Sequence, residues 1–100
     1  WSPHVLDTNG NGRRDAWVEP GQPSDAKRDT RIAAGFYAVM PSPVDGSIWG
    51  TLRGNPGSIV RLDPGKNPHR ALAEIYHVPL PGFGPRGGDI DKQGRVWVSL

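Results

Sequence analysis

Oxygen-bearing side chains recur at alternate positions in DTNGNGRRD, residues 7–15. Calcium loops of the EF-hand type take oxygen ligands from positions 1, 3, 5 and 9 and a backbone carbonyl from position 7, with glycine at position 6 for the turn. If Asp7 is position 1, Gly12 falls at position 6. The ligands are then Asp7, Asn9, Asn11, the carbonyl of Arg13, and Asp15. The spacing predicts a calcium-binding loop.

The pattern departs from an EF-hand at position 12, which is Val18; the acid, Glu19, comes one residue later and completes the predicted set. Two amides and two following arginines lower the ligand charge, so we expect a calcium affinity of about 10⁻⁴ to 10⁻³ M. No open coordination position is evident, which favours a structural rather than a catalytic ion. The alternative is a bare Asn-Gly turn that closes a hairpin between residues 5–6 and 16–18.

The composition limits the protein to one small domain of strands and turns. The chain has 100 residues, of which 14 are Gly and 11 are Pro, and only 35% are hydrophobic. The net charge is +2 with acids and bases interleaved, which indicates neither a nucleic-acid nor a membrane-surface patch. No apolar run approaches the roughly 18 residues of a membrane span. The sequence starts without Met and ends in the apolar run GRVWVSL, so we expect a piece of a longer protein.

Short apolar runs at regular spacing predict an all-β fold. Glycine- and proline-rich breaks separate these runs, and no segment keeps a helical apolar period over three turns. The expected strands cover 35–41, 47–52, 58–62, 72–78, 86–91 and 95–100.

An internal repeat indicates the architecture. DGSIWGTL (45–52) aligns without gaps with QGRVWVSL (93–100), an offset of 48 residues that includes a shared Trp. A period of about 40 to 50 residues with four strands is typical of a β-propeller blade. We therefore expect four-stranded antiparallel blades: a loop-rich insertion with the calcium-like loop over 1–34, one blade over 35–82, and the first half of the next over 83–100.

Three segments resemble the virginiamycin B lyase (streptogramin lyase)-like β-propellers. They are GSIVRLDPG (57–65), EIYHVPLP (74–81) and GPRGGDIDKQGRVWVSL (84–100). Residues 7–15 are in turn similar to the half-loops of dockerins and thrombospondin type 3 repeats. The resemblance implies an exported bacterial protein, periplasmic or extracellular, whose remaining blades belong to the same chain.

The resemblance leaves the activity open. Some members of the family are magnesium-dependent lyases that use a His base and an acidic metal ligand, but His77 and Glu74 match no catalytic motif, so the catalytic residues are unknown. The first expectation is a scaffold that binds a small molecule or protein on its funnel face, with structural Ca²⁺. The alternatives are a lyase that requires Mg²⁺, and a sensor or adhesion module of a larger exported protein.

Loops that follow the second and fourth strands of a blade lie on the face where propellers usually bind ligands. They are RGNPG (53–57) and PGFGPR (81–86). The candidate ligand-surface residues are Arg53, Asn55, Phe83 and Arg86.

Other patterns are set aside on context. GFGPRG (82–87) fits G-x-G-x-x-G but contains Pro85 and precedes a strand, so it predicts no dinucleotide site. The three histidines are too scattered for zinc. No serine has a His and an acid in a readable order, which argues against a hydrolase.

Overall fold

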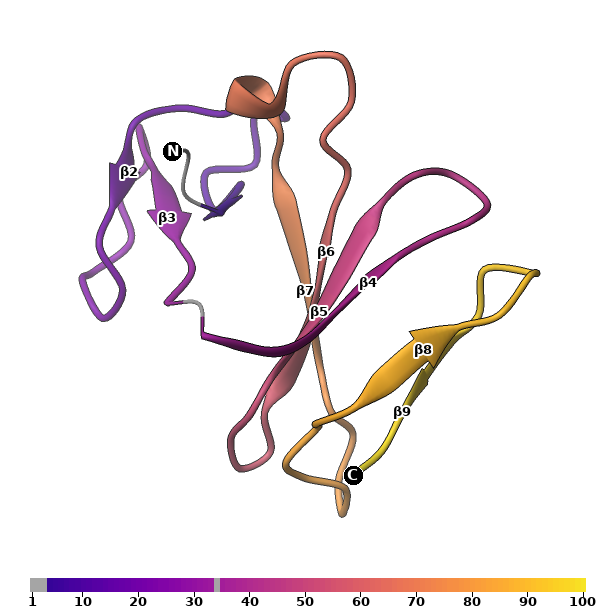
Figure 1. Cartoon of the computed structure of the whole chain (residues 1–100). Helices are drawn as coiled ribbons and strands as arrows, with labels where there is room; N and C mark the ends of the chain where they lie inside the picture. Colours follow the sequence, from indigo (N-terminus) through magenta and orange to yellow (C-terminus); the bar gives the residue numbers. More distant parts are fainter. Residues whose placement is uncertain (1–3, 34) are drawn as a thin grey trace. The chain divides into compact units, whose positions relative to one another are not determined.

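The computed structural model describes residues 4–33 and 35–100, and every regular element there except one short 3₁₀ turn is a β-strand (Figure 1). No helix in this part of the chain is long and apolar enough to cross a membrane. The elements are β1 (Val5–Leu6), β2 (Trp17–Val18), β3 (Asp29–Arg31), β4 (Phe36–Pro41), β5 (Ile48–Leu52), β6 (Ser58–Leu62), η1 (Pro68–Arg70), β7 (Ala73–His77), β8 (Gly88–Ile90) and β9 (Val96–Val98).

The all-β prediction is confirmed, and β4 to β7 lie within a residue or so of the expected strands. β8 and β9 also form where strands were expected but are only three residues long each. Seven strands form one mixed sheet in the order β2-β3-β1-β7-β6-β5-β4, and β8 and β9 form a second. The described residues show no closed propeller.

The first third of the chain differs from expectation because it contains β3. β3 pairs antiparallel with β1 (Leu6 opposite Thr30) and parallel with β2 (Trp17 opposite Asp29). The alternative hairpin between residues 5–6 and 16–18 is therefore wrong, since β3 lies between those two strands.

The chain divides into two compact units, each with its own buried residues. Unit 1 combines the residues before Gly35 with Leu62–Glu74, and unit 2 combines Gly35–Arg61 with Ile75–Leu100. The buried hydrophobic side chains of unit 1 are Val5, Ile32, Ala71 and Ala73; those of unit 2 are Met40, Val60 and Val78.

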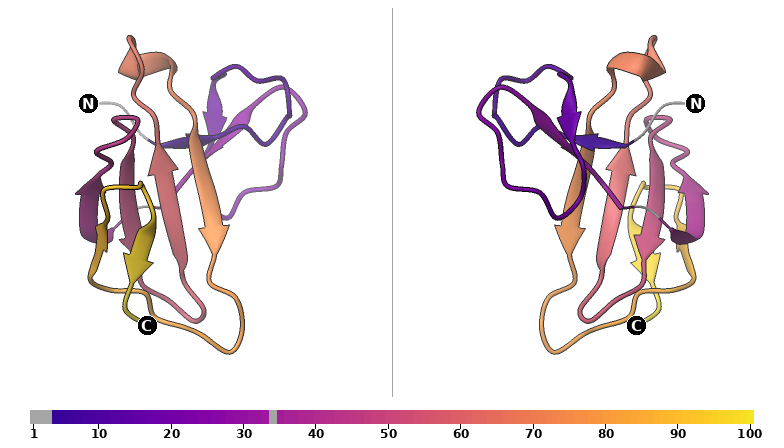
Figure 2. Two further views of the ribbon diagram at one scale, coloured as in Figure 1. Left: turned by 90° about the vertical axis from the view of Figure 1, so that its right-hand side faces the viewer. Right: turned by 90° about the vertical axis from the view of Figure 1, so that its left-hand side faces the viewer.

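Unit 2 is built on the antiparallel pair β4–β5, where Met40 lies opposite Trp49. Burial alternates along β4, with Met40 buried and its neighbours Val39 and Pro41 exposed, as expected for a strand with one covered face. The β8–β9 hairpin packs against β4 (Figure 2), and Gly88 of β8 leaves room for the Met40 side chain.

Candidate functional site

The carboxylate of Asp7 closes the loop between β1 and β2 by accepting hydrogen bonds from three backbone amides. Its Oδ1 accepts from Gly10 N at 2.9 Å and from Asn11 N at 3.2 Å, and its Oδ2 accepts from Gly12 N at 2.8 Å. Gly12 has a φ of 74°, a left-handed conformation that favours glycine. Gly12 therefore makes the turn that the loop pattern assigns to position 6.

Two amide side chains of this loop meet at one carboxylate. Asn9 Nδ2 donates to Asp15 Oδ2 at 2.8 Å, and Asn11 Nδ2 donates to the same oxygen. These hydrogen bonds, that from Asn9 foremost, hold the pKa of the Asp15 carboxyl below its ordinary value. The amide nitrogens of Asn9 and Asn11, and not their oxygens, therefore face the Asp15 carboxylate.

The other predicted ligand positions have different neighbours. Arg13 N donates to Asn11 Oδ1 at 2.9 Å, which continues the turn. Glu19 lies outside the loop, where its Oε2 accepts from Arg31 Nε at 2.6 Å. The Arg14 guanidinium donates at 3.3 Å to the carbonyl of Pro68, which lies in the segment 62–74 of the same unit.

A buried acid that the pattern did not predict lies beside the loop. The Oδ2 of Asp29 accepts from Asp15 N at 2.6 Å, and the residue is 0% exposed. Its Oδ1 is buried with no hydrogen-bond partner among the described residues. Asp29 lies fourteen positions beyond Asp15, so no loop spacing could have indicated it; only the pairing of β2 with β3 brings it there.

Among residues 4–33 and 35–100, no three His, Cys, Asp or Glu side chains form a group that could hold a metal. The loop oxygens come from two acids and two amides, with Asp29 adjacent to them. Calcium accepts both carboxylate and amide oxygens as ligands. The donor types of the loop therefore fit calcium and are unsuited to zinc, which prefers His and Cys.

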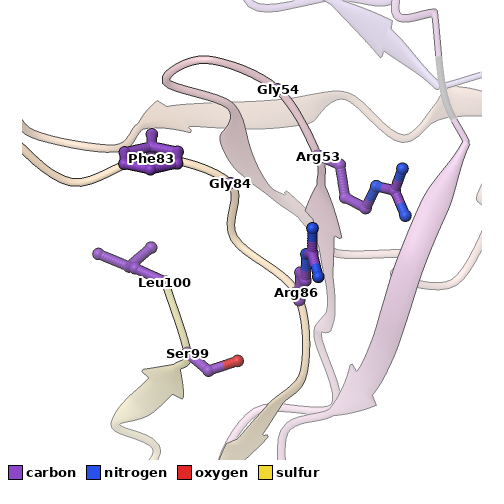
Figure 3. Close-up of a pocket in the computed structure, with 7 residues that line it drawn as sticks. All are labelled: Arg53, Gly54, Phe83, Gly84, Arg86, Ser99 and Leu100. Carbon is purple, nitrogen blue, oxygen red and sulfur yellow. The ribbon is translucent and has the colours of Figure 1, made fainter.

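A hollow of about 570 Å³ lies within unit 2, between the loop after β5 and the loop before β8 (Figure 3). Its lining contains three of the four predicted ligand-surface residues but not Asn55. The lining residues are Arg53, Gly54, Phe83, Gly84, Arg86, Ser99 and Leu100.

Backbone hydrogen bonds hold these two loops together. Gly84 N donates to Gly54 O at 3.0 Å and to Pro56 O at 2.8 Å. Arg86 is fixed on both sides, because its carbonyl accepts from the Thr51 hydroxyl at 2.6 Å and its amide donates to Ser99 O at 3.1 Å. The segment 82–87 opens no helix, as the context of its glycine pattern predicted.

The charge of the hollow is positive. No ion pair joins Arg53 or Arg86 to an acid within the described residues, and none of the lining residues is acidic. The Arg53 guanidinium lies over the Tyr37 ring, 5.9 Å from its centroid, which orients it without neutralising its charge. Figure 3 shows the two arginines on one side of the hollow and Phe83 and Leu100 on the other.

The repeated tryptophans each hydrogen-bond to a polar turn in unit 2. Trp49 Nε1 donates to the Ser47 hydroxyl at 2.9 Å, and that hydroxyl donates to Asp45. Trp97 Nε1 donates directly to Asp91 Oδ2 at 3.0 Å. Hydrogen bonds from Ser47 and from Trp97 are the main reason why the pKa values of Asp45 and Asp91, respectively, lie well below normal.

One serine of unit 2 has a histidine beside it. Ser58 Oγ and His77 Nδ1 are 3.0 Å apart on β6 and β7. Ser58 is buried, and among the described residues no carboxylate hydrogen-bonds to the His77 ring, so the pair lacks the acid of a catalytic triad. The contact satisfies a buried hydroxyl between two strands.

No known family model matches the chain, and neither the curated proteins nor the solved structures include a significant match.

Proposed function

We propose that this chain belongs to an exported bacterial β-propeller of the streptogramin-lyase-like type, which acts as a binding scaffold with a structural calcium loop. Two observations support a propeller-blade architecture. β4 to β7 are neighbours in the sheet in the order in which they occur in the chain. In addition, two hairpins 48 residues apart each contain a Trp whose indole N–H donates to a polar residue of the turn. In this proposal β4–β7 are one blade and β8–β9 begin the next.

The observation that supports ligand binding is the pair of arginines in the hollow. Two guanidinium groups without acidic partners attract an anion, and arginine pairs well with carboxylate or phosphate. Phe83 and Leu100 offer an apolar surface opposite them. A volume of about 570 Å³ is of the size that small-molecule sites have. The proposed ligand is a small molecule that combines a carboxylate or phosphate with an apolar part.

Neutral substitutions of the two arginines test this site. Phenyl phosphate and benzoate are titrated into the protein, and binding is followed by NMR shifts of the amides of residues 53–54 and 83–86. We expect Arg53→Gln and Arg86→Gln each to weaken binding about tenfold or more, since a hydrogen bond to a charged group contributes about 1.5 to 3 kcal/mol.

Lys92→Gln is the matched control because it removes the same charge at an exposed position outside the hollow. Equal weakening in all three variants would show that only net charge matters. Absence of binding to either anion at millimolar concentration would rule out the proposed ligand class.

Calcium in the loop is supported by the spacing of the oxygen-bearing residues from Asp7 to Asp15 and by the turn built on Asp7. Trp17 follows the loop and reports on it by fluorescence. We expect saturable calcium binding with a Kd of about 10⁻⁴ to 10⁻³ M. Asp7→Ala removes one ligand and should abolish the response, whereas a wild-type protein without any response would refute the calcium loop.

A further inference from the structure

The two hairpins of unit 2 that share the sequence repeat also share their strand register. Three consecutive pairs of β4–β5 are Val39 with Gly50, Met40 with Trp49, and Pro41 with Ile48. The matching pairs of β8–β9 are Gly88 with Val98, Asp89 with Trp97, and Ile90 with Val96. The middle pair, which contains the Trp, therefore points to one side of each hairpin, and the two outer pairs point to the other. We call these the Trp side and the flanking side.

The contact between the hairpins joins a flanking side to a Trp side. β8 packs against β4, and a Cβ placed on Gly88 would lie 3.0 Å from Met40 Sδ and 3.4 Å from Val98 Cγ2. Gly88 and Val98 belong to the flanking side of β8–β9, so this side faces β4. Met40, which is buried there, belongs to the Trp side of β4–β5.

This contact leaves one side of each kind exposed. On the flanking side of β4–β5, Val39 is 62% exposed and Ile48 is 38% exposed. On the Trp side of β8–β9, Trp97 is 62% exposed. The Trp97 indole N–H already donates to Asp91 Oδ2 at 3.0 Å, so the ring offers an apolar surface. Exposed apolar side chains gathered on a sheet face are typical of protein interaction sites.

We propose that this protein self-associates head to tail, with Trp97 of one copy packed on Val39 and Ile48 of a second copy. The protein's own packing indicates this occupant, because the two hairpins already join a Trp side to a flanking side. An interface between two different sides is heterologous, so association continues beyond a dimer unless the rotation closes a ring. The interface uses no residue of the loop 7–15 or of the lining of the hollow, and it is independent of both proposed binding sites.

One position makes the second contact weaker than the first. Asp89 occupies the place in β8–β9 that Met40 occupies in β4–β5, and Val39 occupies the place of Gly88. The new contact therefore brings a carboxylate toward an apolar side chain, and its desolvation opposes association. Asp89→Ala removes this charge, and we expect it to lower the Kd of self-association at least about threefold.

Sedimentation velocity of the whole chain measures the association from about 10 μM to 1 mM, the range of weak interfaces. We expect the mean mass of the wild-type protein to rise with concentration. Val39→Lys and Trp97→Lys should each keep the protein monomeric, because each places a charge on one of the two sides. Leu80→Lys is the matched control, since Leu80 is 84% exposed in the same unit but lies on neither side. It should associate as the wild type does.

A mixture of the two Lys variants tests the pairing of the sides. Trp97→Lys keeps the flanking side and Val39→Lys keeps the Trp side, so an equal mixture should form a dimer and grow no further. If Trp97→Lys prevents association and Val39→Lys does not, the Trp sides pair with each other and the proposal is overturned. A wild-type protein that stays monomeric over the whole range overturns it as well.

A measurement on the wild-type protein covers the case in which a Lys variant does not fold. NMR spectra are recorded over the same concentrations. We expect the amide signals of Val39, Ile48 and Trp97 to shift with concentration, while that of Leu80 stays in place. Signals of Val39 and Ile48 that do not move while that of Trp97 does would refute the head-to-tail contact.

Discussion

The hydroxyl of Thr51 joins two segments of unit 2 that support the hollow. It is 0% exposed, donates to Arg86 O at 2.6 Å and accepts from Ala38 N at 3.1 Å. Ala38 lies in an irregular part of β4, where the pairing with β5 shifts register between Phe36 and Val39. The hydroxyl thus accepts from an amide in this irregular stretch. It also fixes the backbone of Arg86, one of the two arginines that line the hollow.

Thr51→Val is expected to lower the free energy of unfolding by about 1 to 2 kcal/mol, because it leaves a part-buried carbonyl and a part-buried amide without their hydrogen-bond partner. Urea denaturation measures this change. Ser99→Ala is the matched control, since it also removes a hydroxyl bonded to a carbonyl, that of Gly87, but at an exposed position. There water replaces the bond, and the loss should be about 0.5 kcal/mol or less. Equal losses would contradict the bridging role of Thr51.

The loop after β5 approaches the loop before β8 so closely that one glycine is required. Gly57 has a φ of 89°, and a Cβ placed on it would lie 2.5 Å from Pro85 Cδ and 2.8 Å from Leu52 O. A side chain there would both adopt an unfavourable backbone conformation and push the two loops apart. The hollow depends on this contact, since Arg53 and Arg86 come from these two loops.

Gly57→Ala is expected to destabilise unit 2 by about 3 kcal/mol or more, the sum of left-handed strain and overpacking. Gly46→Ala provides the comparison, because Gly46 has a φ of 73° but nothing within 4 Å of the added Cβ. That substitution should cost only the strain, about 1 to 2 kcal/mol. Thermal unfolding of both variants, followed by circular dichroism, decides whether the close approach or the backbone angle dominates.

Strands with alternating apolar residues could be predicted from the sequence, and β3 could not. β4, for example, has Phe36, Ala38 and Met40 on its covered side, a period of two that local reasoning detects. β3 has the sequence Asp-Thr-Arg, which contains no apolar residue and has low local preference for a strand. It forms because Leu6 and Trp17 offer pairing partners on both sides.

At the scale of the whole molecule, the chain has two units that each bury a small core, and the proposed calcium loop belongs entirely to unit 1. Arg14, at the end of the loop, donates to the carbonyls of Pro68 and Ala71, and it also lies 5.7 Å over the Trp17 ring. The loop is therefore bound to the distant segment 62–74 of its own unit. We therefore expect a calcium ion bound in the loop to stabilise unit 1.

Calcium is expected to stabilise unit 1 selectively. About 10 mM calcium should add about 1.4 to 2.7 kcal/mol to the free energy of opening, for a Kd of about 10⁻³ to 10⁻⁴ M. Hydrogen exchange followed by NMR measures this for the amides of Val5 and Ile32 in unit 1 and of Val60 in unit 2. The Asp7→Ala variant should show no gain. An equal gain in both units would mean that they open together, contrary to the expectation.

The sequence by itself determined the β class, the strands of unit 2 and the spacing of the loop from Asp7 to Asp15, because each depends on residues close together in the chain. Only the tertiary structure decided that Asp29 lies against Asp15, that Arg53 and Arg86 share one hollow, and that Ser58 meets His77. These pairs are separated by 14 to 33 positions along the chain and meet through strand pairing and loop contacts, which no local pattern encodes.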